Sequence, residues 1–150
     1  MHTTIGIIGN GFVGNAVAKG FEGTNEIRIY DIDSSRSTHS LLDTVRSDYI
    51  FVCLPTPMVD SEGGKCNLSI LKNFFRLVSD IVTDGIFIVK STVPIGTVDT
   101  LVEEYSDLKI VHNPEFLTAA NAEKDFVEAD RHVIGGMPEL TNKVKQLYEN

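Results

Sequence analysis

Short continuous apolar runs recur along the chain, separated by longer stretches in which apolar residues are spaced as on a helix. Continuous runs of strand length are typical of strands that are buried on both faces of a parallel sheet. The predicted strands cover residues 5–8, 27–30, 49–54, 86–90, 108–112 and 131–135.

The stretches between these runs carry apolar residues three or four positions apart, which places them on one face of a helix. Asn67 and Thr97 are candidate caps for two of these helices, and residues 59–66 form a loop that we expect to be mobile. Strands that alternate with helices in this way predict a doubly wound parallel sheet. The stripes consist of Phe12, Val13, Ala16, Val17 and Phe21; Leu71, Phe74, Phe75, Val78, Ile81 and Val82; Val98, Leu101, Val102 and Tyr105; and Leu140, Val144, Leu147 and Tyr148, with an alanine-rich helix over 118–126.

The first predicted strand leads directly into Gly9, Gly11 and Gly14, which have the spacing G-x-G-x-x-G. In a dinucleotide site the first glycine allows the tight turn, the second lets the pyrophosphate approach the backbone, and the third lets the helix pack closely on the sheet. The N–H groups at the start of that helix, with the positive end of its dipole, receive the phosphates. Glycine-rich turns also occur without a ligand, so the assignment of a dinucleotide site depends largely on the strand before the motif and the helix after it.

Asp31 ends the second predicted strand, at about the twenty-residue spacing expected of the carboxylate that binds the adenosine ribose. A carboxylate at this place repels a 2′-phosphate and favours NAD over NADP. Arg36 is a counter-argument, because an arginine nearby can accept that phosphate. Since Asp31 stands at the strand end itself, we predict NAD as the cofactor. The alternative is that Asp31 only turns or caps the chain.

A dinucleotide-binding fold ordinarily has a further strand after the ribose-binding one, but residues 33–48 contain no convincing apolar run. The polar, turn-rich sequence there favours a short helix or an irregular link. We therefore predict an α/β fold, a Rossmann-type doubly wound parallel sheet whose edge strand after Asp31 is missing or rudimentary. At this length, residues 1–150 are expected to form one NAD-binding domain with a single substantial core.

The composition, with 42% hydrophobic and 23% charged residues, is ordinary for a globular protein. The formal net charge of -8 argues against a general surface for nucleic acid or anionic membrane, which needs clustered lysine and arginine. An anionic cofactor stays compatible, because a helix N-terminus supplies local positive potential. No apolar run reaches the length of a membrane span and no signal peptide precedes the first strand, so we expect a cytoplasmic protein.

The cysteines and three of the histidines show no metal-binding pattern. Cys53 and Cys66 have neither metal-ligand spacing nor the arrangement of a disulfide framework. Cys53 is best explained as a small buried hydrophobic residue, and Cys66 as a loop thiol. His39, His112 and His132 have no ligand spacing either. We therefore predict no metal site.

Unusual sequences follow the predicted strands, at the edge where open parallel sheets bind their ligands. Stability alone does not require such a concentration of proline, threonine and carboxylate, although each proline by itself could simply end a strand. All of them would meet at one edge of the sheet. These sequences are Gly9 to Gly14, Asp31, Pro55-Thr56-Pro57, Ser91-Thr92-Val93-Pro94 and Asn113-Pro114-Glu115-Phe116.

The same stretches, in this order, resemble the NAD-binding domain of the UDP-glucose/GDP-mannose dehydrogenase family. The resemblance spans nearly the whole chain and is greatest to UDP-glucose 6-dehydrogenases. The matching motifs are Leu-Pro-Thr-Pro at 54–57, Lys-Ser-Thr-Val-Pro-Ile-Gly-Thr at 90–97, Asn-Pro-Glu-Phe-Leu at 113–117, and the trailing Asp125-Phe126 and Asp130-Arg131-His-Val-Ile-Gly.

The resemblance implies an NAD-dependent oxidoreductase that acts in polysaccharide biosynthesis. The family oxidises the CH₂OH of a nucleotide sugar to a carboxylate in two NAD-dependent steps, through a cysteine-bound thiohemiacetal and thioester. By position, the pyrophosphate would be held by Gly9, Gly11, Phe12, Val13 and Gly14, the adenosine ribose by Asp31 and Arg36, and the rest of the cofactor by Pro55, Thr56 and Thr92.

The resemblance also implies two catalytic residues, Thr92 and Glu115. Thr92 would help to position a proton-relay water, and Glu115 would assist thioester hydrolysis as a general base, since an acyl-enzyme needs an activated water. Glu115, Phe116 and Leu117 would contact the nucleotide sugar. The alternative for Glu115 is an exposed carboxylate at the start of a helix.

The chain departs from the family pattern in three places. Ala119 stands where members commonly carry a second glutamate, and the segment after Asp33 is shorter than usual. The family's catalytic cysteine, lysine and asparagine come from a later domain, and the chain stops at Asn150. We therefore expect it to bind the cofactor without completing the oxidation. The helix through which the family dimerises also comes later, so a monomer and a homodimer both stay open.

Two other functions fit parts of the sequence. One is the cofactor domain of a β-hydroxyacid or 6-phosphogluconate-type dehydrogenase, against which the motif Asn-Pro-Glu-Phe-Leu speaks. The other is a non-catalytic module that binds NAD or a partner, which the missing half and Ala119 favour. The identity of the nucleotide sugar stays open, because its contacts lie mostly outside this domain.

Overall fold

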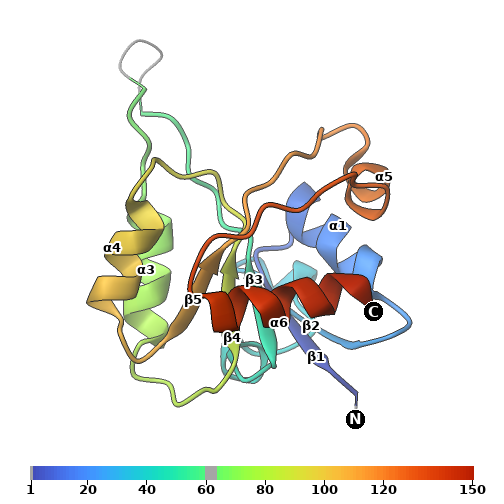
Figure 1. The fold of residues 1–150 in the computed structure, drawn as a ribbon, viewed down its shortest axis with the longest axis horizontal. Helices are drawn as coiled ribbons and strands as arrows, with labels where there is room; N and C mark the ends of the chain where they lie inside the picture. The colour runs from blue at the N-terminus through green and yellow to red at the C-terminus, as the bar shows by residue number, and fades with distance from the viewer. Residues whose placement is uncertain (1, 60–63) are drawn as a thin grey trace.

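The computed structural model describes residues 2–59 and 64–150, and within them the strands form one parallel sheet (Figure 1). The order across the sheet is β2-β1-β3-β4-β5. Ile7 of β1 lies beside Ile29 of β2 on one side and beside Phe51 of β3 on the other. The strands are β1 (Thr4–Ile8), β2 (Glu26–Tyr30), β3 (Tyr49–Val52), β4 (Ile86–Val89) and β5 (Lys109–His112).

Helices cover both faces of this sheet, as the alternating pattern predicts. Successive strand residues point to opposite faces, so Phe51 packs in one core with α1, α5 and α6, while Ile50 packs in the other with α3 and α4. The doubly wound fold is confirmed. The helices are α1 (Phe12–Phe21), α2 (Leu41–Val45), α3 (Ser69–Val78), α4 (Thr97–Glu104), α5 (Ala122–Val127) and α6 (Pro138–Glu149).

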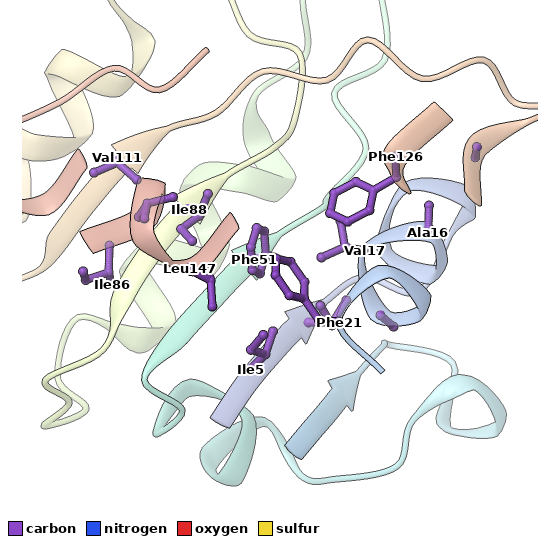
Figure 2. Close-up of a cluster of buried hydrophobic side chains, with 14 of the residues drawn as sticks. Ile5, Ala16, Val17, Phe21, Phe51, Ile86, Ile88, Val111, Phe126 and Leu147 are labelled. Atoms are coloured by element: carbon purple, nitrogen blue, oxygen red, sulfur yellow. The ribbon is translucent and has the colours of Figure 1, made fainter. Parts of the chain in front are cut away.

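Aromatic side chains hold α1 and α5 against the sheet. Figure 2 shows Phe21 of α1, Phe51 of β3 and Phe126 of α5 together in the interior. The Phe21 ring centroid lies 5.5 Å from that of Phe51 and 5.8 Å from that of Phe126. These separations are those of favourable aromatic pairs, which add to the hydrophobic gain of burial. This core fixes α1 relative to β1.

The edge strand after Asp31 is missing, as predicted. A 3₁₀ turn, η1 (Ser34–Arg36), and the short helix α2 occupy this part of the chain, and β2 is the last strand at its side of the sheet. Removing the third strand from the order 3-2-1-4-5-6 and renumbering gives the observed 2-1-3-4-5. The strand order therefore switches between β1 and β3, where sheets of this kind bind their ligands.

The prediction of a last strand over 131–135 is wrong. This segment meets β5 only at one antiparallel bridge, where His112 N donates to Gly135 O (2.8 Å) and Gly135 N donates to His112 O (2.7 Å). The Asn113 side-chain amide donates a hydrogen bond to the Val133 carbonyl at 2.8 Å. The chain then turns at Gly136 (φ +151°) into α6. The β-branched residues Val133 and Ile134 thus cross the end of β5 instead of extending the parallel sheet.

Several predicted element ends shift by a few residues. The strands predicted to end at 54 and 90 end at Val52 and Val89. The helix predicted from residue 118 begins at Ala122, because the Asp125 carboxylate accepts hydrogen bonds from the backbone and hydroxyl of Thr118 and holds the preceding residues in a turn. Helix α3 ends at Val78, so Val82 is 90% exposed and not part of the core.

The two predicted helix caps have different outcomes. The cap position of α3 is Leu68, not Asn67, but the Asn67 side chain one residue earlier accepts a hydrogen bond from Ser69 N at 3.0 Å and satisfies one N–H at the helix start. Thr97 is instead the first residue of α4, and Gly96 (φ +86°) precedes it as the cap without a side-chain hydrogen bond. The predicted loop over 59–66 falls partly outside the described residues. Its base is closed by an antiparallel bridge between Met58 and Cys66.

Candidate functional site

A cleft of about 780 Å³ lies across the carboxyl ends of the strands, over the switch between β1 and β3. Its size is that of a cleft that binds a small molecule or cofactor. The structure thus brings all five predicted stretches to one site. Gly14 and Phe116 are not among the lining residues. The predicted site residues that line the cleft are Gly9, Gly11, Phe12, Val13, Asp31, Arg36, Pro55, Thr56, Thr92, Glu115 and Leu117.

The three glycines of the turn differ in what demands them. Gly9 has φ +90°, and a Cβ there would lie 2.6 Å from the Cys53 carbonyl oxygen. A Cβ on Gly14 would collide with the Gly9 carbonyl. A Cβ on Gly11 would meet no atom within 4 Å, and its backbone (φ -79°) suits any residue. The protein's own packing therefore explains the first and third glycines, whereas at Gly11 only a group entering from the cleft would need the space.

The N-terminus of α1 opens at this turn. Gly11 is its cap residue and offers no side-chain hydrogen bond to the first turn, and Phe12 and Val13 begin the helix. The N–H groups at a helix start have no partner within the helix, and together with the helix dipole they favour an anion. The last residue of α1, Phe21, packs in the aromatic core. The helix is therefore held with its N-terminus at the cleft.

Asp31 sits directly after β2 with its carboxylate held by two backbone groups. Asn10 N donates to Oδ2 at 2.7 Å, and Asp33 N donates to Oδ1 at 2.8 Å. An ionised carboxylate has about four acceptor positions, so about two stay available for a ligand in the cleft. That number matches the two hydroxyls of a ribose.

Arg36 pairs with Asp33 and not with Asp31. The Arg36 Nε atom lies 3.6 Å from Asp33 Oδ2, and both side chains are more than half exposed, so the pair adds little to stability. Hydrogen bonds from the side chain and backbone of Ser35 lower the pKa of the Asp33 carboxyl. Asp33 therefore stays ionised and offsets part of the positive charge that Arg36 would offer to a phosphate.

The loops after β3 and β4 are tied to each other at the middle of the cleft. The Thr56 hydroxyl donates to the Thr92 carbonyl, and the Ser91 hydroxyl donates to the Leu54 carbonyl at 2.7 Å. Cys66 Sγ donates to the Thr56 carbonyl at 3.1 Å. These bonds give the cleft a fixed floor between Asp31 and Glu115.

A buried cation, Lys90, stands at the other end of the cleft and was not predicted. Its side chain is 1% exposed, and Nζ lies 2.9 Å from Glu115 Oε2, whose side chain is 11% exposed. Nζ also donates to Asn113 Oδ1 at 3.1 Å, and this oxygen accepts the Tyr148 hydroxyl at 2.6 Å. Buried charges persist only when they are paired in this way. Glu115 is therefore not an exposed carboxylate at a helix start.

The sequence held one signal for this pair. Val89 and His112 are aligned in the register of β4 and β5, so Lys90 and Asn113 are the next aligned positions. A lysine that follows an entirely apolar strand, beside a strand that continues into Asn113 and Glu115, could have been assigned to a buried ion pair.

Neither cysteine is arranged as a nucleophile. Burial raises the pKa of Cys53 to about 12, although the positive charge of Lys90 acts in the opposite direction. The thiolate is the reactive form of cysteine, so this shift disfavours reaction of Cys53 at neutral pH. Cys66 is engaged with the Thr56 carbonyl. The described residues also contain no cluster of three or more potential metal ligands and no helix long and apolar enough to span a membrane.

Comparison with known proteins identifies the family to which the chain is similar. A sequence profile of the UDP-glucose/GDP-mannose dehydrogenase family, NAD binding domain, matches residues 35–150. The chain is 33% identical over 110 residues to a UDP-N-acetyl-D-mannosamine dehydrogenase of Methanocaldococcus jannaschii, covering 69% of this chain and 26% of that protein. It is 31% identical over 112 residues to a UDP-glucose 6-dehydrogenase of Bacillus subtilis, covering 69% and 25%.

A solved structure shows the same fold. The UDP-glucose dehydrogenase of Pyrobaculum islandicum superposes with a TM-score of 0.83 and 24% identity over 99% of this chain and 44% of that one. The matched stretches thus cover about a quarter of the curated relatives and less than half of the solved relative. The family match includes the strand-end loops from Pro55 to Leu117. The chain therefore belongs to the UDP-glucose/GDP-mannose dehydrogenase family, as an NAD-binding domain.

Proposed function

We propose that the cleft holds NAD and that the chain is the cofactor domain of a nucleotide-sugar dehydrogenase of the UDP-glucose 6-dehydrogenase type. One observation carries this proposal above the others. A single continuous cleft joins the uncapped start of α1, the two remaining acceptor positions of Asp31 and the Lys90–Glu115 pair. These are a site for phosphates, a site for a ribose and a polar site for chemistry, in that order.

The fit to NAD rests on contacts of this chain. The pyrophosphate lies on the N–H groups after Gly11, where a Cβ would fill the space that the phosphates need. The ribose diol binds Asp31, with Arg36 beside it, and the adenine ring packs on the apolar residues Ile32 and Leu77. Pro55, Thr56 and Thr92 border the nicotinamide end.

The chemical roles follow from the arrangement around Glu115. NAD supplies the hydride acceptor for oxidation of the sugar carbon. Glu115 takes a proton from the water that attacks a thioester on a cysteine that this domain does not supply; the C–S bond breaks, and the departing thiolate takes up that proton. Thr92 holds the attacking water by its hydroxyl. Lys90 compensates the buried charge of Glu115. Phe116 and Leu117 extend this end toward the nucleotide sugar.

We also propose that these 150 residues complete no oxidation by themselves. The covalent route needs a thiolate, and neither Cys53 nor Cys66 is placed to provide one. This favours the second candidate, a module that binds NAD without catalysis, as the activity of the chain in isolation. The motif at 113–117 still favours a nucleotide-sugar dehydrogenase over a β-hydroxyacid dehydrogenase as its origin.

An NMR titration tests the placement of the ligands. We expect NAD to shift the amide signals of the turn at 9–14, of the segment 31–36 and of Thr56 and Thr92. UDP-glucose, added next, should shift signals near Glu115 to Leu117, with no NADH absorbance developing. Shifts confined to other surfaces would contradict the proposed site, and NADH formation would contradict the claim of inactivity.

A further inference from the structure

The segment that replaces the missing strand pairs with the outer edge of β2 through both backbone N–H groups and side-chain hydroxyls. Thr38 N and His39 N both donate to the Ile29 carbonyl, at 2.9 and 3.0 Å, as a neighbouring strand would. The Thr38 hydroxyl accepts a hydrogen bond from Ile29 N at 3.0 Å. A hydroxyl oxygen thus stands where a strand would have placed a backbone carbonyl, so the outward-facing N–H and carbonyl of Ile29 are satisfied without a third strand.

Ser37 makes the same substitution at Asp31, and it satisfies two groups. Its hydroxyl accepts a hydrogen bond from Asp31 N at 2.9 Å and donates one to the Asp31 carbonyl at 3.0 Å. A hydroxyl both donates and accepts, so serine or threonine can do this and alanine cannot. The Ser37 backbone is anchored in turn, because Ser37 N donates to Ser34 O at 3.2 Å.

A second tie joins this segment to the glycine turn. The Asn10 side-chain amide donates to the Arg36 carbonyl at 2.9 Å, while Asn10 N donates to the Asp31 carboxylate at 2.7 Å. Asp31 is therefore held at its N–H, its carbonyl and its carboxylate. With the side chain aimed by these bonds, two acceptor positions of the carboxylate stay available to the cleft.

We propose that Ser37 is a positioning residue for cofactor discrimination. Its hydroxyl fixes the backbone of Asp31, so that the carboxylate meets the 2′-hydroxyl of the adenosine ribose and disfavours a 2′-substituted or 2′-deoxy ribose. This inference rests on the proposed placement of NAD. It adds that discrimination depends on a residue that does not touch the ligand, in a segment that exists because the third strand is absent.

The test compares ADP with 2′-deoxy-ADP by calorimetry, because the two differ only in the hydroxyl at issue. Charge-assisted hydrogen bonds contribute roughly 1.5–3 kcal/mol, so the folded chain should prefer ADP by about tenfold or more. In Ser37→Ala this preference should fall several-fold toward unity. Ser37→Thr, which keeps the hydroxyl, should restore it, and Ser34→Ala, at an exposed position of the same turn, should match the unmodified chain.

The ratio of the two affinities separates positioning from a structural role. If Ser37→Ala keeps the full preference for ADP, or loses affinity for both ligands equally, the proposal is wrong. If Ser37→Ala fails to fold, Ser37→Cys keeps a group at this position that hydrogen-bonds more weakly, and it should show a reduced preference. If the unmodified chain binds neither ADP nor NAD, the proposed function itself fails, and this inference falls with it.

Discussion

Lys90 Nζ lies 2.9 Å from Glu115 Oε2 inside the protein, and the two side chains are 1% and 11% exposed. The pair joins the end of β4 to the segment that follows β5, and Lys90 Nζ also donates to Asn113 Oδ1, which accepts the Tyr148 hydroxyl as well. Each charge makes the burial of the other tolerable. The geometry of this end of the cleft therefore depends on both residues.

Replacement of one partner should reveal this dependence. Lys90→Met leaves the Glu115 carboxylate buried without its cation, and we expect the free energy of unfolding in urea to fall by about 3–5 kcal/mol. The double variant Lys90→Met/Glu115→Leu should recover part of the loss. The control Lys145→Met removes an exposed pair with Glu149 and should change stability by less than about 1 kcal/mol. Equal effects of Lys90→Met and Lys145→Met would contradict the buried pair.

The glycines of the turn should separate binding from folding. Gly11→Ala places its Cβ in open space with an ordinary backbone, so thermal stability should stay near that of the unmodified chain. Its affinity for NAD should fall by about tenfold or more, because the methyl group occupies the pyrophosphate position. Gly14→Ala should instead lower the unfolding temperature, because the Cβ meets the Gly9 carbonyl. Unchanged NAD binding by Gly11→Ala would place the pyrophosphate elsewhere.

The stability of the chain should depend on pH through two half-buried imidazoles. Burial lowers the pKa of both His112 and His132 below the ordinary value of 6.5. The unfolded state therefore binds protons at a higher pH than the folded state does. The two histidines thus lower the free energy of unfolding increasingly as pH falls below about 6.5, and they have no such effect above neutral pH.

The variant His132→Phe isolates this effect, because phenylalanine keeps a ring to stack on Tyr148 (centroids 3.8 Å apart). The loss of stability between about pH 7.5 and pH 5.5 should be smaller in His132→Phe than in the unmodified chain. The difference between the two proteins is the readout, since a chain of net charge -8 also changes stability as its carboxylates protonate. Identical pH profiles would exclude a role for His132.

The Cys53 thiol should be protected from reaction in the folded chain. With its pKa raised to about 12 by burial, Cys53 should react with a thiol reagent far more slowly in the folded chain than in urea. The slow phase of labelling, which we assign to Cys53, should disappear in Cys53→Ser. Rapid labelling of Cys53 in the folded chain would show an accessible thiolate and reopen the question of covalent catalysis by these 150 residues.

The sequence was sufficient for the fold because its apolar runs carry the physical requirement of a doubly covered parallel sheet. The absence of such a run at 33–48 was equally informative, and it correctly removed the third strand. At 131–135 the same reasoning failed, since Val133 and Ile134 satisfy a strand pattern while the Asn113 amide binds the Val133 carbonyl. A pattern of apolar residues does not show which backbone groups are already paired.

The candidate site was predictable in its location and less so in its connections. Glycine, aspartate and proline motifs follow strand ends, and parallel strands bring their ends together. The pairing of Lys90 with Glu115 depends on the register of β4 and β5, and the hold of Ser37 on Asp31 depends on a turn that no periodicity describes. The roles of the individual site residues stay predictions.

The most direct test of the central claim is a calorimetric titration of the chain with NAD and then with NADP, repeated on Asp31→Ala. We predict saturable binding of one NAD per chain, weaker binding of NADP, and an affinity for NAD that falls by roughly tenfold or more in the variant as charge-assisted hydrogen bonds are lost. The preference for NAD over NADP should shrink with it. A folded chain that does not bind NAD, or an Asp31→Ala variant that binds it unchanged, would contradict the account.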